Sequence, residues 1–337
     1  MKSSCVAVLT SGRQFAKLTF ALFLAAAFAV PALSADLFTR EDVTFQSKGL
    51  KLSAWYYVPK GASASAKRPA IVMAPPWSAV KEMGLHEIAS RFASEGFVVV
   101  TFDYRTFGGS EGEPRGQLVW YEQIEDYRNA ISWISLRPEV DGSRIGVWGL
   151  SYSGAHVLHL AAFDRRIKAV VSVVPQPQSW KAFYAPLPQK ERDDMHSWIS
   201  QSRIEWFTTG NAAYLPVVSA SGKDASIPQP EAFEWFTRMA KQAPSWENRI
   251  TVDSLEKDMF YDPVAFIELI APTPLLMIAA SDDALSPFNL QKAAFERARE
   301  PKKFLGVKGG HFAALDSPSR EALLTPQVDW FRKYLRP

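Results

Sequence analysis

Residues 144–154 read RIGVWGLSYSG, a short apolar run followed at once by a serine among small residues. The apolar run predicts a buried strand, and the helical pattern that begins at Ser153 predicts a helix directly after it. A serine on such a sharp strand-to-helix turn presents its hydroxyl at the carboxyl edge of a sheet, and small neighbours let the turn close. Ser151 is therefore the candidate nucleophile.

The same residues leave two alternatives open. The turn departs from the G-x-S-x-G pattern, because Ser153 stands at the last glycine position and Gly154 follows it. Ser153 fits the pattern less well as a nucleophile, since Ser151 and Ala155 would then occupy both glycine positions. The glycines could also simply end a strand, with Ser153 capping the helix.

Apolar runs and helical patterns alternate on both sides of this turn. Strands are predicted at 42–45, 50–58, 70–74, 97–102, 144–148, 169–174, 274–280 and 303–307, and helices at 86–94, 118–136, 153–163, 288–299 and 319–334. Such alternation indicates βαβ units, and short strands that are apolar on both faces indicate a parallel sheet covered by helices on each side. The sequence predicts an α/β fold with a doubly wound, mostly parallel sheet.

The alternation fails between residues 176 and 270. This segment carries helical stretches, prolines, charges and five tryptophans: Trp180, Trp198, Trp206, Trp235 and Trp246. We predict a helical cap at 176–270, inserted into a core domain made of residues 36–175 and 271–337. Because tryptophan rings contribute large apolar contact areas, they indicate either an apolar or aromatic substrate or the cap's own core.

Residues 1–35 have the layout of a secretory signal peptide. They contain three basic residues and no acidic one, with an apolar run from Leu18 to Val30 that ends before Pro31. A membrane span needs roughly 20 apolar residues, which is longer than this run, so cleavage is favoured over retention as an anchor. We expect an exported protein, periplasmic or secreted, with no stable membrane span after cleavage.

Composition narrows the possible chemistry. Removal of residues 1–35 lowers the number of Lys and Arg from 38 to 35, equal to the 35 Asp and Glu, and takes away the only cysteine, Cys5. A near-neutral chain without a basic cluster argues against a nucleic-acid partner. Without cysteine, disulfides, cysteine nucleophiles and thiolate metal sites are excluded, so catalysis must use oxygen and nitrogen groups.

Two later segments supply the groups that a serine nucleophile needs. Residues 281–287 read SDDALSP and residues 309–312 read GGHF, each directly after a predicted strand. A serine hydroxyl becomes a good nucleophile when an imidazole takes its proton, and a carboxylate orients that imidazole. We predict His311 as the general base and Asp283 as its partner, with Asp282 as the alternative acid.

Backbone donors for a developing oxyanion are expected at two places. One is the residue after the nucleophile, Tyr152, and the other lies in the loop after strand 70–74. That loop begins with Pro75 and Pro76, which have no N–H group, so Trp77 is its first possible donor. The alternative is that Trp77 only packs within a rigid loop.

With these motifs the chain resembles the α/β-hydrolase superfamily over about residues 40–335. Within it, the resemblance is to dienelactone hydrolase-like and X-prolyl dipeptidyl peptidase (S15)-like proteins, a branch that includes polyketide transferases. Asp283 and Pro287 are similar to the family's D-x-x-x-P loop, and residues 103–112, DYRTFGGSEG, to its D-x-R-G-x-G-x-S-x-G loop, with Thr106 in place of a glycine. Residues 75–76 are prolines where family members commonly have His-Gly.

The resemblance implies a serine-dependent enzyme that uses no metal or organic cofactor. It would act on a small-molecule ester, thioester or amide through an acyl-serine intermediate, with esterase-like activity on an apolar or aromatic acyl substrate the leading expectation. Two alternatives remain: transfer of the acyl group to an acceptor other than water, and a noncatalytic binding protein on the same fold.

Overall fold

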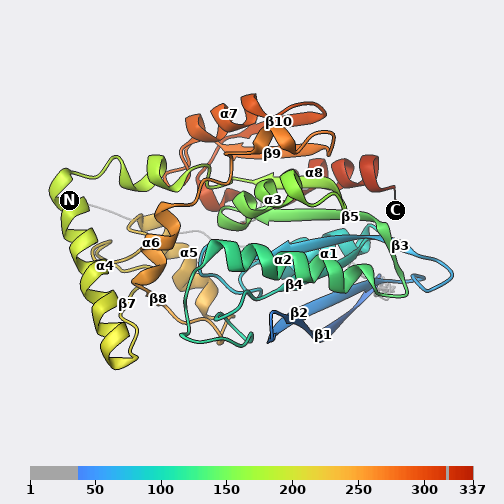
Figure 1. The fold of residues 1–337 in the computed structure, drawn as a ribbon. Helices are drawn as coiled ribbons and strands as arrows, with labels where there is room; N and C mark the ends of the chain where they lie inside the picture. Colours follow the sequence, from blue (N-terminus) through green and yellow to red (C-terminus); the bar gives the residue numbers. More distant parts are fainter. Residues whose placement is uncertain (1–36, 316–318, 337) are drawn as a thin grey trace, which may run out of the picture. The chain divides into compact units, whose positions relative to one another are not determined.

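An eight-stranded sheet forms the centre of the computed structural model, which describes residues 37–315 and 319–336 (Figure 1). The predicted signal peptide lies outside these residues. In sheet order the strands are β1 (Phe38–Ser47), β2 (Leu50–Pro59), β4 (Val98–Phe102), β3 (Arg68–Ala74), β5 (Val140–Leu150), β6 (Ile167–Val173), β9 (Leu275–Ala280) and β10 (Lys302–Val307). From β4 to β10 all neighbours are parallel, whereas β1–β2 and β2–β4 are antiparallel. The predicted mostly parallel sheet is confirmed.

Strand β5 begins earlier than its apolar pattern indicates. Its register with β3 pairs Arg68 with Val140 and then Ala70 with Ile145, so extra residues bulge out between these two pairs. Residues 141–144, which lie between these pairs on β5, are Asp, Gly, Ser and Arg, and a hydropathy pattern assigns them to a turn. Pairing with a neighbouring strand, rather than local sequence, extends β5 to Val140.

Helices cover both faces of the sheet. Helices α1 (Leu85–Ser94) and α8 (Ser319–Leu335) contact each other, and α8 packs on β5 and β6. Helices α2 (Trp120–Ser135) and α3 (Tyr152–Phe163) contact each other on the opposite face, and α7 (Phe288–Arg297) packs on β9. The predicted doubly wound arrangement is thereby confirmed.

The segment predicted to form a cap contains helices and one small ribbon. Between β6 and β9 lie the π-helical turn η1 (Trp180–Tyr184), α4 (Gln189–Thr209), β7 (Tyr214–Leu215), α5 (Pro230–Ala240), β8 (Ile250–Thr251), α6 (Asp253–Met259) and the 3₁₀ turn η2 (Ile267–Leu269). Figure 1 shows α4, α5, α6, β7 and β8 gathered at one end of the sheet. The antiparallel pairing of β7 with β8 was not predicted from the sequence.

The cap's tryptophans have different environments. Trp235 is buried, and Trp246 stacks on Phe236 with ring centroids 5.4 Å apart, so both belong to packed aromatic clusters. Trp180 and Trp198 are 44% and 39% exposed. Part of the aromatic content of this segment therefore belongs to the hydrophobic core.

Within the described part of the chain, the helices are too short or too polar to cross a membrane.

Candidate active site

Ser151 lies at the turn between β5 and α3. Its backbone has φ 58° and ψ −115°, a conformation that is strained for a residue with a Cβ atom. The turn also requires Gly149, because a Cβ at that position would lie 2.1 Å from the carbonyl oxygen of Ser153. This geometry matches the strained strand-to-helix elbow that exposes a nucleophilic serine.

Ser153 is fully buried and braces this turn. Its Oγ accepts a hydrogen bond from the backbone N–H of Leu150 (2.9 Å) and donates to the carbonyl oxygen of Ala74 (2.8 Å). The second contact ties the end of β5 to the end of β3. The Ser153 hydroxyl is thus engaged with backbone groups, whereas the neighbouring Ser151 carries the strained backbone.

His311 and Asp283 form a direct pair. His311 Nδ1 lies 2.8 Å from Asp283 Oδ2, and both side chains are buried. The backbone N–H groups of Leu285 (2.9 Å) and Ser286 (2.7 Å) donate to Asp283 Oδ1 and hold the carboxylate in place. Asp282 is exposed and accepts a hydrogen bond from the Ser281 hydroxyl instead. Of the two adjacent acids, Asp283 is the one that contacts the histidine.

The three candidate residues follow the carboxyl ends of parallel strands β5, β9 and β10, and so meet at one edge of the sheet. Ser151 is 8% exposed and His311 1%. Within residues 37–315 and 319–336, no side-chain hydrogen bond joins Ser151 to His311. Such bonds are often long without substrate and shorten in the substrate complex.

The loop after β3 carries Trp77 beside the nucleophile turn. The Trp77 and Tyr152 rings meet edge to face, with centroids 4.9 Å apart. Two indole N–H groups join this loop to the cap: Trp77 Nε1 donates to Ser226 Oγ (3.2 Å), and Trp246 Nε1 donates to the carbonyl oxygen of Ser78 (3.1 Å). Trp77 therefore packs against the cap, and the proposed donor role of its backbone N–H remains a prediction.

A buried ion pair anchors the same loop. Lys81 Nζ lies 2.7 Å from Asp103 Oδ2, and the backbone N–H of Lys81 donates to Asp103 Oδ1 at 2.7 Å. Asp103 Oδ2 also accepts the backbone N–H of Gly109 (3.0 Å). Burial lowers the pKa of Lys81, but contacts with Asp103 and Glu82 outweigh it, so the net pKa is raised and the ammonium stays charged. One carboxylate holds the loops after β3 and β4.

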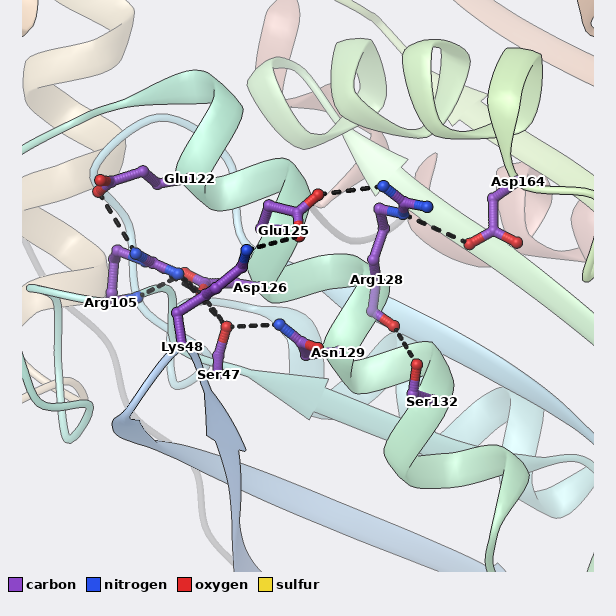
Figure 2. A network of polar contacts seen from close by, with 10 residues as sticks. All are labelled: Ser47, Lys48, Arg105, Glu122, Glu125, Asp126, Arg128, Asn129, Ser132 and Asp164. Atoms are coloured by element: carbon purple, nitrogen blue, oxygen red, sulfur yellow. Dashed lines mark hydrogen bonds and ion pairs between the residues drawn. The ribbon is translucent and has the colours of Figure 1, made fainter.

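A second polar network holds the loop after β4 to α2. The Arg105 guanidinium donates to buried Asp126 from Nη2 (2.7 Å) and Nε (3.1 Å), as Figure 2 shows. Ser47 Oγ donates to Asp126 Oδ1 (2.6 Å) and accepts from Asn129 Nδ2 (2.9 Å). The network joins β1, the loop and α2, and its charges are paired internally, which favours a structural role.

The local structure explains why Thr106 can stand where the family's loop pattern has a glycine. Its φ of 69° lies in the left-handed region, where glycine has no steric penalty and a β-branched residue does. Thr106 Oγ1 donates to the Gln117 carbonyl (2.9 Å) and accepts the Gln117 N–H (3.1 Å). These two bonds, which glycine would lack, offset the backbone strain.

A buried carboxylate lies where the cap meets the nucleophile turn. Asp258 on α6 accepts hydrogen bonds from Gln176 Nε2, Ser179 Oγ and Tyr184 OH, each at 3.0 Å. The backbone N–H of Gln176 donates to the Ser151 carbonyl (3.2 Å). Burial raises the pKa of Asp258 to about 6, although these hydrogen bonds oppose the shift.

This shift predicts a pH dependence of stability. Between about pH 4 and pH 6 the folded Asp258 holds a proton that the unfolded chain has released, so the free energy of unfolding should fall by about 3 kcal/mol as pH rises, then level off. Urea unfolding of wild type and Asp258→Asn across this range measures it. The variant should lack this part of the slope, while the control Asp262→Asn should keep it. Equal slopes for wild type and Asp258→Asn would contradict the prediction.

The sequence analysis did not find two cap acids beside the site, Asp258 and Glu231. Neither belongs to a motif, and their positions depend on how the cap packs against the core. His156, on helix α3, is buried, and its ring nitrogens contact Tyr261 OH (2.6 Å) and Gln123 Oε1 (3.0 Å). Among the described residues, no group of three or more His, Cys, Asp or Glu side chains is arranged to hold a metal ion.

Comparison with known proteins places the chain among related enzymes. Polyketide transferase claH of Penicillium crustosum is 30% identical over 308 residues, which cover 88% of this chain and 97% of the relative. A thiohydrolase of Eupenicillium brefeldianum is 29% identical over 303 residues, covering 87% and 94%. The crystal structure of the α/β hydrolase GrgF from Penicillium sp. sh18 superposes with a TM-score of 0.76 at 28% identity, covering 89% of this chain and all of that one.

A family model described as X-Pro dipeptidyl-peptidase (S15 family) matches residues 48–312. The match includes the elbow, the cap and both loops that carry the candidate acid and base. It confirms the resemblance seen in the motifs, and the superposition confirms the fold. The chain therefore belongs to the S15 family of α/β hydrolases, a family of enzymes.

Proposed function

We propose that the protein is a serine-dependent acyl hydrolase acting on a small ester or thioester. The observation that carries the proposal is the buried His311–Asp283 pair, set at the same sheet edge as the strained elbow of Ser151. A histidine whose Nδ1 is bonded to a carboxylate presents Nε2 as a base, the arrangement that activates a serine hydroxyl.

In the proposed reaction, Ser151 Oγ attacks the acyl carbonyl carbon and its proton passes to His311 Nε2. The tetrahedral intermediate collapses as the leaving alcohol or thiol takes that proton, which leaves an acyl-serine. Water attacks the acyl-serine with His311 again acting as base, and Ser151 is regenerated. The backbone N–H groups of Trp77 and Tyr152 would stabilise the oxyanion in both steps.

Two relatives support an acyl ester or thioester as substrate class. One is a thiohydrolase and the other a polyketide transferase, and both align over most of this chain. The Trp77 ring, which packs edge to face on Tyr152 next to the elbow, suits an apolar acyl group, because rings provide large nonpolar contact area. We accordingly propose a carbon-rich acyl chain as the group that Ser151 carries.

Mass spectrometry of the protein treated with a fluorophosphonate tests the proposal. We expect a single adduct on the folded protein, located on the peptide that contains Ser151, and slower labelling when a short-chain acyl thioester competes. No adduct on the folded protein would overturn the enzyme assignment in favour of a noncatalytic binding protein.

Acyl transfer is a second candidate, favoured by the burial of Ser151 and His311 at 8% and 1% exposure. A site that excludes water lets another acceptor compete for the acyl-serine. Product analysis with an added alcohol or amine distinguishes the two reactions. A product mixture that follows the acceptor concentration supports transfer, and free acid alone supports hydrolysis.

We also propose that the protein is exported to the periplasm or beyond the cell. The basic start and apolar run of residues 1–35 support export. Expression of the full chain followed by intact-mass measurement and cell fractionation tests it. A mature protein that begins near Ala35 or Asp36 outside the cytoplasm is expected, and a cytoplasmic protein that keeps residues 1–35 would overturn it.

A further inference from the structure

The first turns of cap helix α5 lie on the two loops that carry the candidate base and acid. Trp235, which is 2% exposed, stacks on Phe312 next to His311, with ring centroids 4.6 Å apart and planes 11° apart. Just before the helix, Gln229 Nε2 donates to the carbonyl oxygen of Ala284, next to Asp283 (3.4 Å). The cap is thus attached directly to the histidine loop and the aspartate loop.

Glu231, at the start of α5, brings a third charged group to this place. A Cβ added at Gly310 would lie 2.5 Å from Glu231 Oε2, so the carboxylate touches the backbone that leads into His311. The other oxygen, Oε1, is buried and has no hydrogen-bond partner among the described residues. Glu231 is therefore a partly buried carboxylate with an unused acceptor beside the base.

Among the described residues, the charged groups that act most strongly on Glu231 are His311 and Asp283. Burial is the largest effect on the pKa of the Glu231 carboxyl, and it raises this pKa. The charge of His311 and the backbone N–H groups of His311 and Ala284 lower the pKa, whereas Asp283 raises it. The net pKa of Glu231 is raised. Glu231 and His311 are therefore close enough to interact electrostatically, and a negative carboxylate stabilises a positive imidazolium. That species forms each time His311 takes the proton of Ser151.

We propose that Glu231 is a positioning residue for His311: its carboxylate holds the histidine loop against the cap and stabilises the imidazolium that forms during acyl transfer to Ser151. The inference rests on the function proposed above. It adds to the Ser151, His311 and Asp283 set a residue from the cap, so the base has its full electrostatic environment only while α5 is docked.

Removing the charge without changing the shape tests this role. In Glu231→Gln we expect the second-order rate of fluorophosphonate labelling to fall about 3- to 10-fold at its high-pH plateau, and its acid limb to move down by about 0.5 to 1 pH unit. Both changes would have one cause, the loss of a negative charge that stabilises the imidazolium. Glu231→Asp should recover part of the plateau rate.

Glu234→Gln is the matched control, since Glu234 is exposed on the same helix. It should reproduce the wild-type rate and pH profile. Thermal unfolding of both variants shows whether α5 still packs, and a Glu231→Gln profile equal to that of the control in a folded protein would overturn the proposal.

NMR titration of the His311 ring separates this inference from the proposed function, because it needs neither labelling nor turnover. A lower titration midpoint in Glu231→Gln than in wild type supports the positioning role even if the natural reaction differs. An unchanged midpoint overturns it even if Ser151 is labelled. Absence of labelling in wild type, by contrast, counts against the proposed function.

Discussion

Replacing Ser151 with alanine should lower the turnover of a p-nitrophenyl ester or an acyl thioester by about 10⁴- to 10⁶-fold, while the protein stays folded. The nucleophile, its base and the orienting acid act as a unit, so loss of the hydroxyl removes the covalent route entirely. What remains would be the contribution of binding and oxyanion stabilisation. Initial rates and fluorophosphonate labelling measure the effect, and both should be lost together.

Ser153→Ala is the informative comparison, because Ser153 is the other serine of the elbow. Its hydroxyl bonds Leu150 and Ala74, so the variant should be less stable, yet the adduct should still form on Ser151. Ser200→Ala, on an exposed part of α4, controls for serine removal in general. Full turnover by Ser151→Ala, or loss of labelling only in Ser153→Ala, would show that Ser151 is not the nucleophile.

Asp103→Asn should lower the free energy of unfolding by about 3 to 5 kcal/mol, the usual cost of leaving a buried charge without its partner. Lys81 is 4% exposed, and Glu82 would be the one carboxylate left in contact with its ammonium group among the described residues. Because folded proteins are stable by only about 5 to 15 kcal/mol, this is a large part of the total. Urea unfolding followed by tryptophan fluorescence measures it.

Two further variants isolate the buried pair. Asp194→Asn breaks the exposed Lys190–Asp194 pair on α4 and should change the free energy of unfolding very little, because solvent screens that pair. Lys81→Met combined with Asp103→Asn removes both buried charges and keeps a side-chain oxygen as a backbone acceptor, so it should recover part of the lost stability. If Asp103→Asn costs no more than Asp194→Asn, the pair does not anchor the loops as the geometry indicates.

Much of the fold could be predicted because its signals are local. The strands that become β4, β6 and β9 are mostly apolar, with Thr101, Lys168 and Ser172 as the exceptions, and this pattern indicates central strands of a parallel sheet. The strand-to-helix turn at Ser151 could also be predicted, because a serine among small residues directly after a buried strand is typical of this turn. The observed ends of some elements differ by a few residues from the predicted ends, because pairing with a neighbouring strand lengthens the element, as it does for β5.

The choice between Asp282 and Asp283 needed the folded turn. Both are acids on the same short loop, and only the backbone N–H groups of Leu285 and Ser286 show which carboxylate turns inward to His311. The conformation of Thr106 also could not be predicted. Its strained φ and its two hydrogen bonds to Gln117 depend on how the loop after β4 folds back on itself, which the sequence pattern does not show.

The sequence by itself determined the alternating α/β core, the elbow of Ser151 and the chain order of serine, acid and histidine, because each follows from the periodicity or turn chemistry of neighbouring residues. Tertiary structure alone decided the cap's contribution. Glu231 comes to lie beside His311, and Asp258 beside the Ser151 turn, through packing between segments far apart in sequence. Such contacts depend on how helices, strands and loops pack against one another, and the local pattern of the sequence does not predict them.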